Sequence, residues 1–117
     1  MAETVTQTVA DYVHAMTYAD AGLLRQSFDP RAAITGTFEG ATEWLPLEDF
    51  IDRIRAQEES PYPDEDAFEI LGIDKQGNCA SVKLVMRLRG AEYCDYLSLL
   101  HEAGDWTIVH RLFYLQG

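Results

Sequence analysis

Apolar residues in the first half of the chain recur at the three- and four-residue spacing of a helix face. The first such run consists of Val5, Val9, Tyr12, Val13 and Met16. A shorter run at positions 23–28 ends at Asp29-Pro30, and proline disfavours helix in the residue before it. A third run at positions 47–54 follows Pro46, a residue type suited to a first helical turn. The pattern therefore predicts three helices, with strands at 33–38 and 43–45 between the second and the third.

In the second half of the chain, segments rich in β-branched and aromatic residues alternate with short turn signals. The predicted strands cover residues 68–74, 80–88, 93–101 and 106–115, and an acidic loop at 57–69 precedes them. Four strands joined by short turns make an antiparallel meander. We therefore predict one α+β domain over residues 1–117, with the helices packed on one face of a curved sheet.

Charge narrows the range of partners. The chain has 20 Asp and Glu residues against 9 Lys and Arg, a formal net charge of −11 over 117 residues. This charge repels phosphate backbones and anionic lipid, so we expect neither nucleic acid nor a membrane as a partner. No run approaches the ~20 apolar residues of a membrane helix, and we predict a cytoplasmic location. CxxC and HExxH motifs do not occur, and we predict no metal site and no cofactor.

Three stretches of the sequence resemble the nuclear transport factor 2-like superfamily. They are VADYVHAMTYADAGLLRQSFDPRAAITG, the segment around PLEDFIDRI, and DYLSLLHEAGDWTIVHRLFY. The last stretch is most similar to the small bacterial proteins called putative lumazine-binding, which are grouped with SnoaL-like proteins. The resemblance implies a cone-shaped barrel in which three helices from the N-terminal half pack on a curved, six-stranded mixed sheet.

The superfamily includes ketosteroid isomerase, whose catalytic residues can be sought in this chain. The Y-V-x-A pattern of the first predicted helix aligns the isomerase's oxyanion tyrosine with Tyr12. In the same alignment, the general-base aspartate falls on Gly36 and the second oxyanion acid falls on Leu97. Because two of the three catalytic groups are absent, we do not expect that reaction.

Two hairpins predict which side chains share a face of the sheet. If Gly90-Ala91 and Ala103-Gly104 are two-residue loops, the two registers agree on the faces. One set is Leu84, Met86, Leu88, Tyr93, Asp95, Leu97, His110, Leu112 and Tyr114. The resemblance implies that this set lines the interior of the cone. A one-residue bulge in either hairpin would invert the assignment for one strand.

The inward set combines apolar and polar side chains, as small-ligand clefts do. Asp95 and His110 become diagonal neighbours about 7 Å apart, and a carboxylate that orients an imidazole is a common form of general base. The candidate catalytic residues are therefore His110 as the base, Asp95 to orient it, and Tyr12 to polarise a carbonyl or phenolate oxygen. The candidate ligand-binding residues are Met16, Trp44, Phe50, Leu84, Met86, Tyr93, Leu97, Leu112 and Tyr114.

Three functions remain open. The first is a binding protein that holds a small apolar or aromatic ligand inside the cone, and the missing isomerase residues favour it. The second is an enzyme of the isomerase, dehydratase or cyclase type that uses His110. The third is an accessory interaction module whose core is filled by its own side chains, which an interior too small for a ring-sized molecule would favour.

The outward set predicts a homodimer through the convex face of the sheet. Its apolar members are Val85, Tyr96, Leu100, Val109 and Phe113, and its basic members are Lys83, Arg87 and Arg111. Exposed apolar surface of this extent usually has a partner, and local positive charge offsets the repulsion between two acidic chains. The resemblance also implies dimers through this face.

Overall fold

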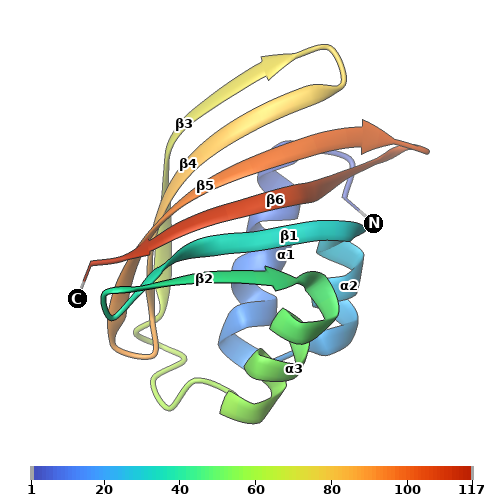
Figure 1. Ribbon diagram of the computed structural model, residues 1–117. Coiled ribbons are helices and arrows are strands. Elements are labelled where there is room, and N and C mark those ends of the chain that lie inside the picture. The colour runs from blue at the N-terminus through green and yellow to red at the C-terminus, as the bar shows by residue number, and fades with distance from the viewer. Residues whose placement is uncertain (1, 117) are drawn as a thin grey trace.

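The computed structural model describes residues 2–116, which form three helices and six strands in the predicted order (Figure 1). The first half contains α1 (Val5–Tyr18), α2 (Ala21–Ser27), β1 (Phe28–Phe38), β2 (Ala41–Pro46) and α3 (Leu47–Gln57). The second half contains β3 (Ala67–Gln76), β4 (Cys79–Leu88), β5 (Ala91–Glu102) and β6 (Asp105–Leu115). The three helices lie together on one side of the sheet (Figure 1). We call that side the concave face and the opposite side the convex face.

The sheet is mixed, which confirms the predicted fold class. The strand order in the sheet is β2-β1-β6-β5-β4-β3. The pair of β1 and β6 is parallel, and every other neighbouring pair in the sheet is antiparallel. The sheet is curved, and β2 and β3 form its two edges and do not pair with each other. It is therefore an open cone and not a closed barrel. The parallel pair brings β1 beside β6, so the first and last strands of the chain are neighbours within the sheet.

Local signals explain where the helices begin and end. The side chain of Thr4 accepts a hydrogen bond from Gln7 N at 3.1 Å and caps α1, and Asp20 caps α2 in the same way. Pro46 ends β2 and immediately precedes α3, consistent with its suitability for a helix start. Within residues 2–116, no helix has both the length and the apolar character needed to cross a membrane.

The core lies between the helices and the concave face. The predicted apolar face of α1 is buried, and the Tyr12 ring packs edge-on against Phe28 with centroids 5.6 Å apart. Phe50 and Ile51 close the core from α3. Burial of such apolar surface is the main favourable term in folding, so it sets the position of α1 and α3 over the sheet.

The hairpin between β4 and β5 differs from the predicted register by two residues. The loop is Arg89-Gly90, both with positive φ, and Leu88 pairs with Ala91. The predicted Gly90-Ala91 loop would pair Met86 with Asp95, and this prediction is wrong, because Asp95 pairs with Leu84. A shift of two residues preserves the alternation of side chains, so the predicted faces of β4 and β5 are correct.

The hairpin between β5 and β6 contains a bulge that overturns the predicted faces of β6. Near the loop, Leu99 pairs with Ile108, as the predicted Ala103-Gly104 loop requires, but the next pair is Ser98 with His110. Val109 is therefore an extra residue on β6, and the strand beyond it is turned over. Arg111 and Phe113 are buried on the concave face, whereas His110, Leu112 and Tyr114 lie on the convex face.

Candidate functional site

Three polar side chains meet in the interior of the cone. The hydroxyl of Tyr12 on α1 donates to Oδ2 of Asp95 on β5 at 2.6 Å. Arg111 on β6 donates from Nε to Oδ2 at 3.0 Å and from Nη2 to Oδ1 at 3.2 Å. Asp95 is 0% exposed and Arg111 is 3% exposed. The result is a two-pronged ion pair in the protein interior, with the tyrosine hydroxyl as a third member.

Aromatic rings surround the guanidinium of Arg111. Its central carbon lies 4.4 Å from the ring centroid of Phe113, 5.6 Å from that of Phe50, 5.7 Å from that of Tyr93 and 5.8 Å from that of Tyr12. A planar, weakly hydrated guanidinium is attracted to ring faces and suits such an environment better than an ammonium group would. The rings and Asp95 together hold the side chain in one orientation.

The protonation of these groups follows from their surroundings. Burial lowers the pKa of Arg111. The charge of Asp95, the neighbouring tyrosines and the hydrogen bonds to Asp95 raise it by more, so the pKa lies above its ordinary value. Burial raises the pKa of Tyr12 well above its ordinary value, with Arg111 acting in the opposite direction and Asp95 in the same one. Arg111 is therefore charged, and Tyr12 keeps the proton that it donates to Asp95.

A cavity of about 100 Å³ adjoins this cluster, between the concave face, α1 and α3. Its apolar lining residues are Met16, Ile34, Phe38, Leu45, Phe50, Ile54, Leu88, Tyr93 and Phe113. Its polar lining residues are Glu43, Arg53, Gln57 and Arg111. Arg53 on α3 donates to Glu43 on β2, and this ion pair, whose arginine side chain is 46% exposed, forms the rim. The cavity thus has apolar walls, a charged rim and a buried guanidinium.

The structure brings some of the predicted site residues together. Met16, Phe50 and Tyr93 line the cavity. Leu84, Met86 and Leu97 are buried in the core on the concave side but are not among the residues lining this cavity. Tyr12 and Asp95 lie beside the cavity and are hydrogen-bonded to each other.

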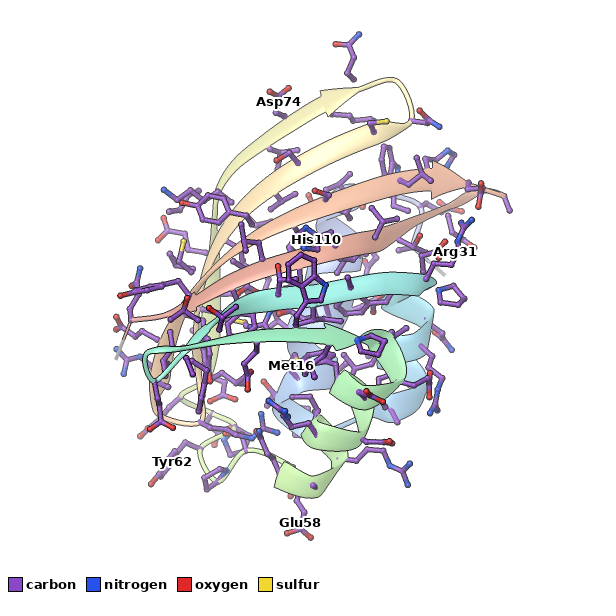
Figure 2. All side chains as sticks on the ribbon, viewed as in Figure 1. Met16, Arg31, Glu58, Tyr62, Asp74 and His110 are labelled. Carbon is purple, nitrogen blue, oxygen red and sulfur yellow. The ribbon has the colours of Figure 1, made fainter. Side chains whose placement is uncertain are left out.

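Four predicted site residues lie elsewhere, because of the β6 bulge and the orientation of β2. His110 is on the convex face (Figure 2). Its Nε2 lies 2.9 Å from Thr35 Oγ1. Since Asp95 points into the cone, the predicted pair of Asp95 and His110 does not form. Leu112 and Tyr114 are exposed on the convex face for the same reason. Trp44, predicted to border the pocket, is 76% exposed opposite Thr35 on that face.

Arg111 was missed as a site residue, because the predicted register placed it on the convex face. One signal could have indicated its position: the apolar residues Trp106, Ile108 and Phe113 are spaced by two and then five, which a bulge between them would reconcile with a single face. Phe113 was predicted on the convex face with Arg111, and it is buried instead.

The exposed apolar side chains of the convex face include Tyr96, as predicted, together with three residues that were predicted to line the interior or the pocket. The most exposed of them are Trp44, Tyr114, Tyr96 and Leu112, at 76%, 55%, 47% and 44%. We call these four residues the convex patch. Trp44, Leu112 and Tyr96 lie in one row across β2, β6 and β5, because Thr35 pairs with both Trp44 and Leu112, and Leu112 pairs with Tyr96. Val85, Leu100 and Val109, which were also predicted on this face, are partly exposed.

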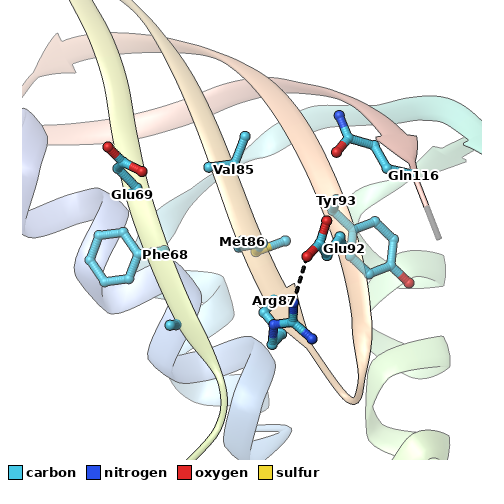
Figure 3. Close-up of a pocket in the computed structure, with 9 residues that line it drawn as sticks. Phe68, Glu69, Val85, Met86, Arg87, Glu92, Tyr93 and Gln116 are labelled. Atoms are coloured by element: carbon cyan, nitrogen blue, oxygen red, sulfur yellow. Dashed lines mark hydrogen bonds and ion pairs between the residues drawn. The ribbon is translucent and has the colours of Figure 1, made fainter.

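A broader and shallower hollow of about 450 Å³ lies along β3, β4 and β5 (Figure 3). Phe68, Val85 and Met86 contribute apolar surface to it. Arg87 on β4 and Glu92 on β5 also line this hollow and are joined by a hydrogen bond (Figure 3). Among the residues that the structure describes, no three His, Cys, Asp or Glu side chains are grouped as a metal site would need.

The positions aligned with the isomerase acids carry no acid and, at Gly36, no room for one. A Cβ atom on Gly36 would lie 2.2 Å from the carbonyl oxygen of Phe113 and 2.5 Å from a carbon of its ring. Leu97 is buried and pairs with Arg111. The guanidinium therefore lies beside the position where that enzyme has an acid.

The fold and the cavity define a nuclear transport factor 2-like protein, and solved structures agree. An NTF-2 like protein of unknown function from Silicibacter pomeroyi DSS-3 is 26% identical, with a TM-score of 0.88 over 96% of this chain and 92% of its own. An NTF2-like protein of unknown function from Shewanella baltica OS155 is 24% identical, with a TM-score of 0.84 over 96% and 90%. A ketosteroid isomerase-like protein from Erwinia carotovora atroseptica SCRI1043 shares the fold at 12% identity, with a TM-score of 0.71 over 97% and 94%.

Within this class, the sequence matches one family over nearly its whole length. The family model described as "Putative lumazine-binding" matches residues 1–114. The chain belongs to this family, which confirms the predicted superfamily and family. No curated protein matches the sequence.

Proposed function

We propose that this protein binds a small, largely apolar ligand in the cavity between α1, α3 and the concave face. The observation that carries the proposal is the cavity of about 100 Å³, with its apolar walls and one buried guanidinium. Ligand sites commonly combine an apolar lining with a few placed polar groups. The family description, which names lumazine, supports a heterocyclic ligand.

The volume limits the size of the ligand. An apolar cavity of about 150 Å³ can hold benzene, so this cavity of about 100 Å³ takes no more than one small ring, with part of the ligand in its open mouth. Lumazine has two fused rings, and a ligand of that size would require Arg53 and Glu43 to part at the rim. The space argues against the filled-core interaction module, because an unfilled cavity of this size is unfavourable in a core that serves only for packing.

A fragment titration followed by amide NMR tests this proposal. Single-ring fragments should shift the amide signals of cavity-lining residues. Leu45→Phe, which fills part of the cavity, should weaken their binding about tenfold or more, while Leu112→Phe on the convex face should leave it within twofold. Equal affinities for the two variants, or signals that shift only on the convex face, would refute binding in the cone.

An enzyme of the isomerase, dehydratase or cyclase type receives less support. Both carboxylate oxygens of Asp95 accept hydrogen bonds from Tyr12 and Arg111, and Glu43 accepts one from Arg53. A general base needs a free oxygen or nitrogen within reach of the ligand. Among the acidic and His residues that the structure describes, only Glu43 lines the cavity, and one of its two carboxylate oxygens is held by Arg53 at the rim.

We also propose that two copies of the chain associate through the convex patch. The support is the exposed apolar surface of its four residues together with the charge balance around it. Lys83 lies over the ring of Tyr96 with its Nζ 5.6 Å from the centroid, and Arg87 is paired with Glu92. A second copy would meet less repulsion here than elsewhere on a chain with a net charge of −11.

Light scattering at about 20 µM tests the dimer, with a matched pair of variants. Leu112→Glu places a charge in the convex patch and should give monomers. Leu71→Glu places the same charge at a similarly exposed apolar residue on the edge strand β3, outside the convex patch, and should leave the dimer intact. A monomeric wild type, or an unaffected Leu112→Glu variant, would contradict this interface.

The cytoplasmic location of the protein and its grouping with SnoaL-like proteins stay predictions. The strongly acidic composition supports the expectation that nucleic acid and anionic membranes are not partners.

A further inference from the structure

Arg111 uses only part of its hydrogen-bonding capacity within the protein. A guanidinium has five N–H donors, and Asp95 accepts from Nε and Nη2. Within residues 2–116, the hydrogen bonds of the guanidinium use Nε and Nη2, and Nη1 is left without a protein partner but is not sealed from solvent, in a side chain that is 3% exposed and borders the cavity. The cavity is therefore where Nη1 meets an acceptor, either water or a ligand that displaces the water.

The charges around the cavity balance. Arg111 is paired with Asp95, and Arg53 is paired with Glu43 at the rim. Two positive and two negative side chains therefore leave no net charge for an anion to neutralise. Moving an anion out of water into such a site is far less favourable than moving a neutral carbonyl group. The overall charge of −11 adds repulsion of an anion from the whole molecule.

The orientation of the free nitrogen is fixed by its neighbours. Asp95 holds one edge of the guanidinium with two hydrogen bonds, Tyr12 holds Asp95, and the ring of Phe113 lies 4.4 Å from the guanidinium carbon. An acceptor must therefore approach in the plane of the guanidinium. Asp95 and Tyr12 are thus positioning residues for the group that contacts the ligand.

Resting on the proposed function, we infer that the ligand is a small ring compound with a neutral hydrogen-bond acceptor, such as a carbonyl or amide oxygen, that binds Nη1 of Arg111. The ring occupies the apolar part of the cavity, and the oxygen takes the place of the missing acceptor. Carboxylates and compounds without an acceptor are bound more weakly.

Three compounds of similar shape test this inference on the wild-type protein. Benzamide carries a neutral acceptor, benzoate carries an anionic one, and isopropylbenzene carries none. In titrations followed by ¹H–¹⁵N NMR, benzamide should bind at least about tenfold more tightly than either of the others. It alone should also strongly shift the Nε–H signal of Arg111.

The outcomes separate this inference from the proposed function. If none of the three compounds shifts cavity-lining amides, the proposed function itself fails. If isopropylbenzene binds as tightly as benzamide, the cavity binds ligands but the role of Arg111 is overturned. If benzoate binds most tightly, the charge balance is overturned.

Asp95→Asn tests the charge balance directly. It keeps the size of the side chain but leaves the positive charge of Arg111 without a counter-charge, so the preference should change from benzamide to benzoate. Glu48→Gln removes the same charge from an exposed ion pair with Arg25 and should leave the ranking of the three compounds unchanged. If Asp95→Asn folds and still prefers benzamide, the inference is refuted, and if it does not fold, the wild-type ranking decides.

Discussion

Replacing Asp95 with leucine should destabilise the protein more than any surface substitution. The change leaves the guanidinium of Arg111, at 3% exposure, without a counter-charge. Breaking a buried ion pair by removing one partner typically costs about 3–5 kcal/mol. The hydroxyl of Tyr12 also loses its hydrogen bond to Asp95, which adds roughly 1 kcal/mol or more. A total of about 4–6 kcal/mol is a large part of the ~5–15 kcal/mol that stabilises a typical domain.

The charge of Arg111 cannot relieve this loss. Its attraction to Asp95 and the neighbouring tyrosines holds the pKa of Arg111 above its ordinary value in the wild type, and arginine stays charged at any pH at which the protein folds. Replacing both partners with apolar residues should restore stability, because a buried pair and apolar side chains of similar size are often about equally stable. The double variant Asp95→Leu, Arg111→Met should therefore be at least about 2 kcal/mol more stable than Asp95→Leu alone.

Urea unfolding followed by circular dichroism measures these free energies. The matched control is Glu48→Gln, which removes a carboxylate from Arg25 in a pair whose side chains are 48% and 61% exposed. That loss should be below about 1 kcal/mol, because exposed ion pairs are screened by water. A loss below about 1 kcal/mol for Asp95→Leu, or no recovery in the double variant, would show that the buried pair is not the source of stability.

Three further predictions follow from the same structure. Gly36→Ala should reduce the free energy of unfolding by about 3 kcal/mol in the same urea assay, because its Cβ would lie 2.2 Å from a backbone oxygen of Phe113. Gly72→Ala has open space around it and should change that free energy by less than about 1 kcal/mol. A 3-oxo-Δ5 steroid should not be isomerised above the background rate in an absorbance assay, since positions 36 and 97 lack the acids of that reaction. Stability should fall as the pH rises above about 10, where tyrosine ionises in the unfolded chain while burial keeps Tyr12 protonated in the fold; Tyr12→Phe should make that fall less steep in pH-dependent melting.

Most of the fold could be predicted because its signals are local. The helix faces, the turn residues and the alternation along β4 and β5 are each contained within about a dozen residues. Even the wrong register of the β4–β5 loop preserved the faces, because it was wrong by two residues. Tyr12 and Asp95 were consequently placed on the correct side of the sheet.

The remainder of the site depends on contacts that are distant in sequence. On β6, the set with His110 and Leu112 and the set with Arg111 and Phe113 each combine a basic side chain with a large apolar one, so alternation alone does not separate them. The bulge at Val109 decides between them, and it is coupled to the parallel pairing of β6 with β1. That pairing joins positions about 80 residues apart, such as Ala33 and His110, and no local pattern specifies it.

The two tryptophans lie in opposite environments, and this difference gives the protein two built-in optical probes. Trp44 is 76% exposed in the convex patch, while Trp106 is 5% exposed at the start of β6, with the ammonium of Lys75 5.3 Å from its ring centroid. Quenching by iodide should therefore act on Trp44 in separated chains and be suppressed when the convex patch is covered. The emission of Trp106 should instead shift to longer wavelengths only when the core opens. Fluorescence from one unlabelled sample can thus distinguish dissociation of subunits from loss of the fold.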